Sequence, residues 1–325
     1  MYYLGIDLGG TNIAIGIVDE NYNILIKDSV PTGAEREGRE VIRDMADLCK
    51  KLLAEKNISI DEIEYAGIAT PGTANSDTGI VEYANNLNFE NFPIADILTE
   101  FLGVKKVYIE NDANAAALAE AVAGAAQGTK HSVMITLGTG VGGGIIIDNK
   151  VYSGFNFAGA ELGHIVIEHD GVPCNCGRKG CWEAYSSAPS LVRMTKEKIE
   201  ECRANGIKTA MEDDIDGDLS KVSAKTAFAV MKATGDKAAT EVVNKYIAYL
   251  GTGIANIINI FQPEILSIGG GICKEGDNLL VPLMNNINSQ RYTRGDSKQT
   301  VIKVASLGND AGIIGAAALG IAKLR

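Results

Sequence analysis

The chain has 325 residues, a net charge of −11 and 46% apolar residues. Most single hydrophobic cores are smaller than this, so we expect two domains or one core divided into two lobes. The acidic charge argues against binding to nucleic acids or anionic membranes, because both require clustered Lys and Arg. The chain shows no N-terminal signal segment and no uncharged apolar run of about 18 residues, so we expect a cytoplasmic protein.

Residues 2–19, YYLGIDLGGTNIAIGIVD, predict two strands joined by a glycine turn. The turn glycines allow backbone N–H groups to approach a phosphate closely. Asp7 stands beside this turn, where a carboxylate can hold a magnesium ion through water. An ordinary β-hairpin explains the same pattern, and no Walker motif follows it.

Helical spacing of apolar residues predicts a helix over 37–56, and a short strand over 63–69 leads into Thr70-Pro71-Gly72. The next segment, 83–91, is rich in asparagine. Asparagine side chains both donate and accept hydrogen bonds, which suits sugar hydroxyls, so Asn86 is a candidate ligand. Asparagines in loops also serve as plain turn formers.

A strand over 105–110 ends at Asn111-Asp112, and the alanine-rich stretch 113–126 predicts a helix. Asp112 therefore lies at or near the helix N-cap, and capping alone would explain a carboxylate there. The alternative is a general base at a strand end, positioned to accept a proton from a substrate hydroxyl.

Residues 133–148, VMITLGTGVGGGIIID, repeat the pattern of strand, glycine turn and strand. Leu8-Gly9 and Leu137-Gly138 correspond, and an aspartate follows each pair at the same distance. This internal similarity predicts two related lobes, each contributing one phosphate-binding hairpin. Thr139 and Gly140 are the candidate contacts of the second.

The segment 159–183 contains three of the six cysteines and two of the three histidines. Cysteines in a reducing compartment favour metal binding over disulfides. The spacing predicts a tetrahedral, structural zinc site, with His169 as an alternative to the histidine ligand; the ligands are His164, Cys174, Cys176 and Cys181. Glu161 and Glu183 flank the set, so a bound metal would fix them relative to each other and allow them to hold a polyhydroxylated ligand.

Helices are predicted over 188–203, 224–234, 237–260 and 311–324. A buried strand over 265–268 runs into Gly269-Gly270-Gly271. Three consecutive glycines permit a flat group such as adenine or ribose to lie against the backbone, although a simple strand-to-helix turn is the common alternative.

The order of these motifs resembles the ROK family of sugar kinases and repressors. The residues that carry the resemblance span nearly the whole chain: DLGGT at 7–11, ENDANAAA at 110–117, LGTGVGGG at 137–144, GAELGH at 159–164, CNCGRKGCWE at 174–183 and GGG at 269–271. The resemblance implies a two-lobed α/β fold of the actin-like ATPase (ribonuclease H-like) type, shared by hexokinase, Hsp70 and actin. We expect a small lobe over 1–112, a large lobe over 113–310 and a C-terminal helix, 311–325, that docks on the small lobe.

The resemblance also implies an ATP-dependent hexose kinase that acts on the 6-hydroxyl of glucose, with Asp112 as general base. The implied sugar ligands are Gly72, Asn86, Asn111, Asp112, Glu161, His164 and Glu183. The implied contacts to ATP and Mg²⁺ are Asp7, Gly9, Gly10, Thr11, Asn12, Thr139, Gly140, Gly269, Gly270 and Gly271. His164 would bind zinc through one ring nitrogen and the sugar through the other. A homodimer or homotetramer is implied as well.

Three alternatives remain open from the sequence. The substrate is another hexose, such as fructose, mannose, allose, N-acetylmannosamine or N-acetylglucosamine. The protein is a sugar-sensing regulator of the same family, which the acidic charge and a first strand beginning at Tyr2, with no preceding helix-turn-helix, argue against. The last alternative is a structural zinc protein whose other motifs are vestigial.

Overall fold

The computed structural model describes residues 1–293, 295 and 297–324. Its N-terminal part is built on a mixed five-stranded sheet of order β3-β2-β1-β4-β8. The strands are β1 (Tyr2–Leu8), β2 (Asn12–Asp19), β3 (Ile24–Pro31), β4 (Ile63–Thr70) and β8 (Val107–Asn111). We call this sheet and the elements packed around it the small lobe.

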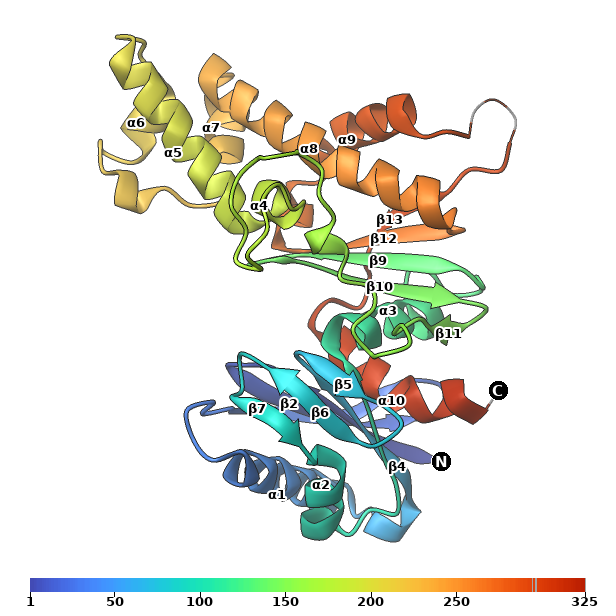
Figure 1. Ribbon diagram of the computed structural model, residues 1–325. Coiled ribbons are helices and arrows are strands. Elements are labelled where there is room, and N and C mark those ends of the chain that lie inside the picture. Colours follow the sequence, from blue (N-terminus) through green and yellow to red (C-terminus); the bar gives the residue numbers. More distant parts are fainter. Residues whose placement is uncertain (294, 296, 325) are drawn as a thin grey trace.

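The remaining elements of the small lobe are two helices and a separate three-stranded sheet. They are α1 (Gly38–Lys56), α2 (Ile94–Leu102), β5 (Thr73–Asn75), β6 (Ile80–Ala84) and β7 (Phe89–Phe92). The asparagine-rich segment 83–91 thus connects two of these short strands. Figure 1 shows α1 and α2 below the small-lobe sheet, on the side away from the rest of the molecule.

The large lobe is built on a second five-stranded sheet of order β11-β10-β9-β12-β13. Its strands are β9 (Ser132–Leu137), β10 (Val141–Ile147), β11 (Lys150–Val151), β12 (Ile265–Gly270) and β13 (Val301–Val304). The helices of this lobe are α4 (Glu183–Ser186), α5 (Ala188–Ala204), α6 (Ala210–Asp214), α7 (Thr226–Thr234), α8 (Lys237–Phe261) and α9 (Asp277–Gln290).

The two five-stranded sheets have the same arrangement. In each, an antiparallel hairpin begins the sheet, a third strand extends it antiparallel on one side, and two parallel strands complete it on the other. The β1–β2 hairpin corresponds to β9–β10 in this scheme. The internal repeat that the two glycine turns predict therefore extends over both sheets.

Helices α3 (Asp112–Ala123) and α10 (Ala311–Leu324) connect the lobes. Helix α3 follows β8 of the small lobe but packs against β9 and β10 of the large lobe. Helix α10 follows β13 of the large lobe but packs against β1 and β4 of the small lobe. The two helices also pack against each other, and Figure 1 shows both between the two sheets.

The alternation of side chains along β1 explains how its two faces are used. Leu4, Ile6 and Leu8 are fully buried in a cluster with the apolar side of α1. The opposite face carries Gly5 and Asp7 toward α10. A Cβ at Gly5 would collide with the backbone carbonyl of Ile313, so glycine allows the helix to approach the strand this closely.

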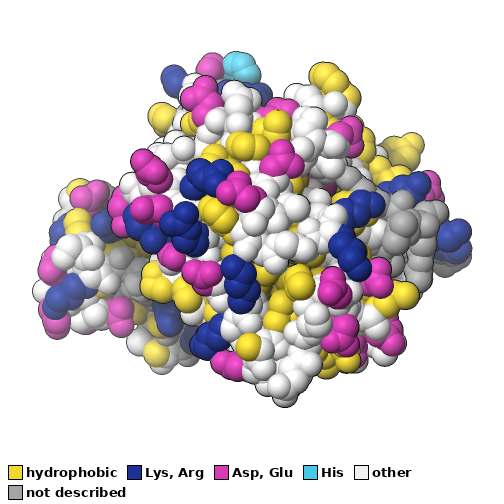
Figure 2. Space-filling model, turned by 90° about the horizontal axis from the view of Figure 1, so that it is seen from below, with side chains coloured by type: hydrophobic (Ala, Val, Ile, Leu, Met, Phe, Trp, Pro, Cys, Tyr) yellow, Lys and Arg dark blue, Asp and Glu magenta, His cyan; other side chains and the backbone are white. Residues whose placement is uncertain are grey.

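The surface seen from below, on the small-lobe side, carries Lys, Arg, Asp and Glu side chains interspersed with one another (Figure 2). This face has no single large basic area. Within the part of the chain that the structure describes, no helix has the length and apolarity needed to cross a membrane.

The close contact between β4 and α10 provides a test of this packing. A Cβ at Gly67 would collide with the backbone carbonyl of Ala316. Because backbone atoms cannot move aside cheaply, Gly67→Ala should lower the free energy of unfolding by about 1–3 kcal/mol in urea titrations. Gly138→Ala, at a position where a Cβ would have no neighbour within 4 Å, should change it by less than about 0.5 kcal/mol. Equal effects from the two variants would contradict this account.

Candidate active site between the lobes

A cavity of about 970 Å³ lies where the end of β1, the turn between β9 and β10 and the beginnings of α3 and α10 meet. It is lined by segments far apart in the sequence, including the strand end at Asp7, the start of α3 and the turn between β9 and β10. The residues predicted from sequence that line it are Asp7, Gly72, Asn86, Asn111, Asp112, Thr139, Gly140, Glu161, His164, Glu183, Gly269, Gly270 and Gly271.

The first glycine turn is held against the small lobe. Gly9 N–H donates to Asn12 O at 2.9 Å, and Thr32 Oγ1 donates to Gly9 O at 2.6 Å. The turn residues Gly9, Gly10, Thr11 and Asn12 are not among those that line the cavity. A Cβ built at Gly10 would lie 3.4 Å from Cβ of Asn86, which does line it. The turn is thus adjacent to the cavity, and its role in binding phosphate stays a prediction.

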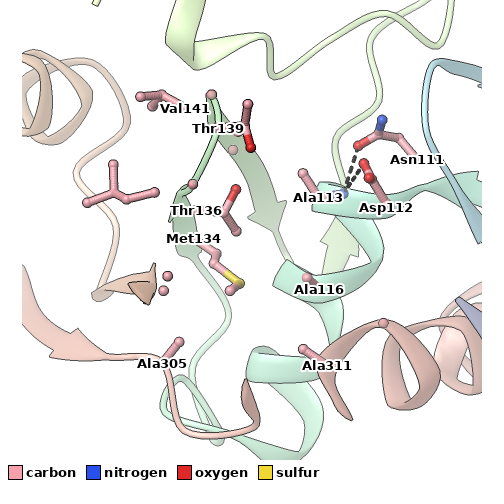
Figure 3. A pocket seen from close by; sticks show the side chains of 18 of the residues that line it. Asn111, Asp112, Ala113, Ala116, Met134, Thr136, Thr139, Val141, Ala305 and Ala311 are labelled. Carbon is pink, nitrogen blue, oxygen red and sulfur yellow. Dashed lines mark hydrogen bonds between the residues drawn. The ribbon is translucent and has the colours of Figure 1, made fainter. Parts of the chain in front are cut away.

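The start of α3 presents Asp112 to the cavity. Asn111 is the helix N-cap, because its Oδ1 accepts hydrogen bonds from Ala113 N–H at 3.0 Å and Asn114 N–H at 3.3 Å. Asp112 is the first helical residue, and its Oδ1 also accepts from Ala113 N–H, at 2.8 Å (Figure 3). Helix capping therefore falls to Asn111 and does not account for a carboxylate at Asp112.

Asn111 connects the start of α3 to the turn after β4. Its Nδ2 donates to Gly72 O at 3.1 Å. Gly72 has φ of +86°, and a Cβ there would collide with Tyr83 O, so a side chain is excluded for two reasons. The turn after β4 can approach both Asn111 and the end of β6 only because residue 72 is glycine.

Four carboxylates line the cavity, and their surroundings disfavour the charged form of three of them. Burial and the nearby Asp112 raise the pKa of Asp7 to about 6. The side chains of Asp112 and Glu161 are accessible from the cavity. The surrounding protein still removes water from around both carboxylates, and this desolvation raises the pKa of each. For Glu161, His164 opposes this burial effect, while Asp112 and Glu183 add to it. Several kcal/mol of repulsion would oppose a bound polyanion unless cations accompany it.

The predicted metal ligands converge at one point. Their ligand atoms, in His164, Cys174, Cys176 and Cys181, all lie within 4.8 Å of one another. Cys176 Sγ and Cys181 Sγ are 3.6 Å apart, and Cys174 Sγ is 3.6 Å from His164 Nδ1. Two sulfurs on a tetrahedral zinc ion would be separated by about 3.8 Å, so the donor atoms fit this ion.

The histidine of this cluster also faces the cavity. His164 Nδ1 points to the cysteines, while its Nε2 lies 4.0 Å from Glu161 Oε2. His169 is not part of the cluster; its side chain is almost fully exposed and lies 3.3 Å from Asp170. The alternative that His169 replaces His164 as a ligand is therefore wrong.

Glu183 connects the cluster to the second glycine hairpin. Its Oε2 accepts a hydrogen bond from Val141 N–H at 2.9 Å, and its Oε1 lies 4.0 Å from Cys174 Sγ. Trp182, for which the sequence suggests no role, is fully buried and packs on Gly253 of α8. A Cβ at Gly253 would collide with the indole ring, so Trp182 anchors the segment between Cys181 and Glu183 to the large lobe.

Several residues that line the cavity are missing from the predicted set. Lys274, which follows the three glycines, is the only Lys or Arg among the described residues that line it. Asn309, just before α10, lines it as Asn111 does before α3. The sequence contains a signal for Asn309, because Asn-Asp-Ala at 111–113 recurs at 309–311 at the start of the corresponding helix.

Comparison with known proteins identifies the family. The model of the ROK family matches residues 3–323. The chain belongs to the ROK family. The glucokinase of Halalkalibacterium halodurans is 37% identical, over 97% of this chain and 93% of its own. The glucokinase of Thermotoga maritima is also 37% identical, over 97% of this chain and 96% of its own.

Solved structures of ROK proteins have the same fold. The ROK glucokinase from Streptomyces griseus, in complex with glucose and AMPPNP, superimposes with a TM-score of 0.77 at 32% identity, covering 98% of this chain and 99% of that one. These matches confirm the family and the fold class that the motifs predict.

The raised pKa of Asp7 predicts a pH-dependent stability. Because the folded protein resists ionisation of Asp7, whose pKa rises from 3.8 to about 6, stability is lost as the pH rises through this range. Asp7→Asn stays neutral, so its gain in unfolding free energy over the wild type should grow from near zero at pH 4 to about 1–3 kcal/mol at pH 7. Denaturant titrations at both pH values measure this. Asp96→Asn, at an exposed position in α2, is the control. If Asp7→Asn and the wild type differed in unfolding free energy by the same amount at both pH values, the raised pKa of Asp7 would be contradicted.

Proposed function

We propose that the protein is an ATP-dependent glucokinase that transfers the γ-phosphoryl group of ATP to the 6-hydroxyl of glucose. The observation that carries this proposal is the position of Asp112, at the start of α3, in one cavity with Glu161, His164, Glu183 and the glycine segments 138–140 and 269–271. Two relatives at 37% identity are glucokinases, and a structural neighbour binds glucose and AMPPNP, an ATP analogue.

Asp112 is the proposed general base. It would accept the proton of the sugar hydroxyl as the oxygen attacks the γ-phosphorus and ADP leaves. A general base needs a carboxylate oxygen that is available to the substrate and a pKa near the pH at which the enzyme works. The structure supports this role in two ways: Asn111 is the helix N-cap, so Asp112 shares only the Ala113 N–H donor with it, and burial raises the pKa of Asp112.

The sugar would be held mainly by carboxylate, amide and imidazole groups. Glu161, Glu183 and His164 Nε2 offer acceptors or donors from the metal-binding segment, and Asn86 and Asn111 offer amides from the small lobe. Gly72 would approach the ring through its backbone. These groups come from both lobes, so closure of the lobes would complete the sugar site and exclude water.

The nucleotide would lie toward the glycine segments. Thr139, Gly140 and Gly269–Gly271 line that part of the cavity, with Gly9–Asn12 adjacent to it. The four carboxylates would repel a triphosphate, so a divalent cation must accompany it, and Asp7 is the proposed Mg²⁺ partner through water. Magnesium supplies charge neutralisation of the transferred phosphoryl group.

Zinc is the proposed ion of the cysteine cluster, held by His164, Cys174, Cys176 and Cys181. Four protein ligands leave no open coordination position, so the role is structural. We propose further that the lobe boundaries lie at 112 and 310, where β8 and β13 lead into the connecting helices, and that the protein forms a homodimer or homotetramer.

A coupled assay of ADP release tests the function. Wild-type protein with ATP and Mg²⁺ should turn over glucose with a higher kcat/KM than mannose, fructose, allose or the N-acetylated amino sugars. Asp112→Asn should lower kcat by about 10²–10⁴-fold, because a positioned general base contributes this much. Glucose should still bind, as measured through the fluorescence of Trp182, the single tryptophan.

The exposed Asp96→Asn in α2 should retain wild-type kcat and is the matched control. No turnover of any hexose by the wild type would rule out a kinase, and turnover of one other sugar alone would assign a different substrate. Unchanged kcat in Asp112→Asn would remove this residue as the base.

Metal analysis of protein purified without added metal should find one zinc ion per chain. Cys176→Ser should abolish this zinc and lower the thermal midpoint by at least about 5 °C, because a structural metal contributes directly to folding stability. His169→Ala, which removes an exposed imidazole five residues from His164, should retain both. A metal-free protein with full activity would refute the zinc site.

A further inference from the structure

The chain crosses between the lobes at two places, and the second crossing segment lies against the cavity. It runs over 305–310, from the end of β13 in the large lobe to the start of α10 on the small lobe. Ala305, Gly308 and Asn309 line the cavity on the side of the three glycines. Ser306 and Leu307 lie between them, so their backbone sets the position of this wall.

The carboxylate of Glu120 holds this backbone. Its Oε1 accepts hydrogen bonds from Ser306 N–H and Leu307 N–H, both at 2.9 Å. Its Oε2 accepts from Ser306 Oγ at 3.2 Å and from Ala125 N–H at 2.6 Å. Each of these four partners is a donor, which is the arrangement that a carboxylate requires and an amide cannot satisfy.

Glu120 is almost completely inaccessible, at 1% exposure, and no ion pair involves it among the described residues. A buried carboxylate without a cation is costly, and loss of its donors would leave it unsatisfied. The contact therefore strongly favours one position of the segment. A Cβ at Gly124 would collide with the same carboxylate, so the end of α3 is shaped to admit it.

The segment fixed in this way leads directly to the start of α10 beside Asp7. A Cβ at Gly312, in the first turn of α10, would collide with the Asp7 carboxylate. Ala119, one residue before Glu120, packs with Ala311 and Ile314 of the same helix. The proposed sugar-side groups, in contrast, come from other segments: the turn after β4, the β6–β7 connection, the start of α3 and residues 161–183.

We propose that Glu120 is a positioning residue for the nucleotide: it fixes the second crossing segment so that the ATP side of the cavity and the start of α10 are formed before ATP binds. This rests on the ATP-dependent activity proposed above. Glu120 touches neither substrate and acts through the backbone of Ser306 and Leu307. Its removal acts selectively on ATP and leaves the sugar side intact.

The test compares binding and kinetic constants for the two substrates. Calorimetry measures ATP binding, Trp182 fluorescence measures glucose binding without turnover, and steady-state kinetics give KM for each. Glu120→Gln replaces one accepting oxygen by an amide N–H that faces other donors. It should raise Kd and KM for ATP by about tenfold and change those for glucose by less than about twofold.

Two further variants make the outcome decisive. Ser306→Ala removes only the hydroxyl donor and should weaken ATP binding by about threefold, again without affecting glucose. Glu264→Gln is the control: Glu264 also accepts two backbone N–H groups, from Lys130 and His131, but it is exposed and outside the cavity. It should change neither substrate's constants.

Equal effects of Glu120→Gln on ATP and glucose, or no effect on either in a folded protein, would overturn the proposal. If Glu120→Gln does not fold, Ser306→Ala decides, and the absence of an ATP-selective effect there refutes it. These binding measurements need no turnover. A wild type that binds ATP but phosphorylates no hexose would refute the glucokinase activity and leave the assignment of Glu120 to be decided by its own constants.

Discussion

The arrangement of the two lobes depends on the exchange of helices α3 and α10. Each helix leaves the sheet that precedes it and packs on the sheet of the other lobe, so neither lobe has a complete core without the other. The exchange needs close backbone contact, and glycines at 5, 67 and 315 provide it, since a Cβ at any of them would collide with backbone carbonyl groups. The proposed active-site cavity lies where the two helices begin, and its geometry follows from this packing.

This arrangement also explains the electrostatics of the cavity. The N-terminal ends of α3 and α10 both line the cavity, where the helix dipoles favour anions. Four carboxylates line it as well, and Lys274 is the only Lys or Arg among the described residues that do so. Such a site binds a polyanion only together with cations. Burial raises the pKa of both Asp7 and Asp112, and the nearby Asp112 adds to the shift at Asp7, so each carboxylate holds a proton more tightly than it would in water.

The sequence predicts those parts of the structure whose cause is local. Glycine turns between apolar strands, the alanine-rich helix after Asp112 and four metal ligands within 18 residues all leave a pattern that can be read directly. The sites of Lys274 and Glu120 leave no such pattern, because Glu120 meets residues 186 and 187 positions away. Asn309 is an intermediate case. The sequence repeats Asn-Asp-Ala at 111–113 and 309–311, but only the matching topology of the two sheets shows that the repeat corresponds to equivalent positions in the two lobes.

The segment that holds the Cys/His cluster contacts the cavity through Glu183 and Val141. The ligand set fixes Cys181, the buried Trp182 anchors the next position to α8, and Glu183 follows at once with its Oε2 on Val141 N–H. Val141 begins β10 directly after the Thr139–Gly140 turn. Disorder of the cysteine cluster would therefore release Glu183 and the turn before β10 together, the proposed sugar and nucleotide contacts. Glu120, in contrast, contacts a separate segment, through Ser306 and Leu307. On the proposed assignments, loss of the cluster would therefore affect both substrates and loss of the Glu120 contact ATP alone.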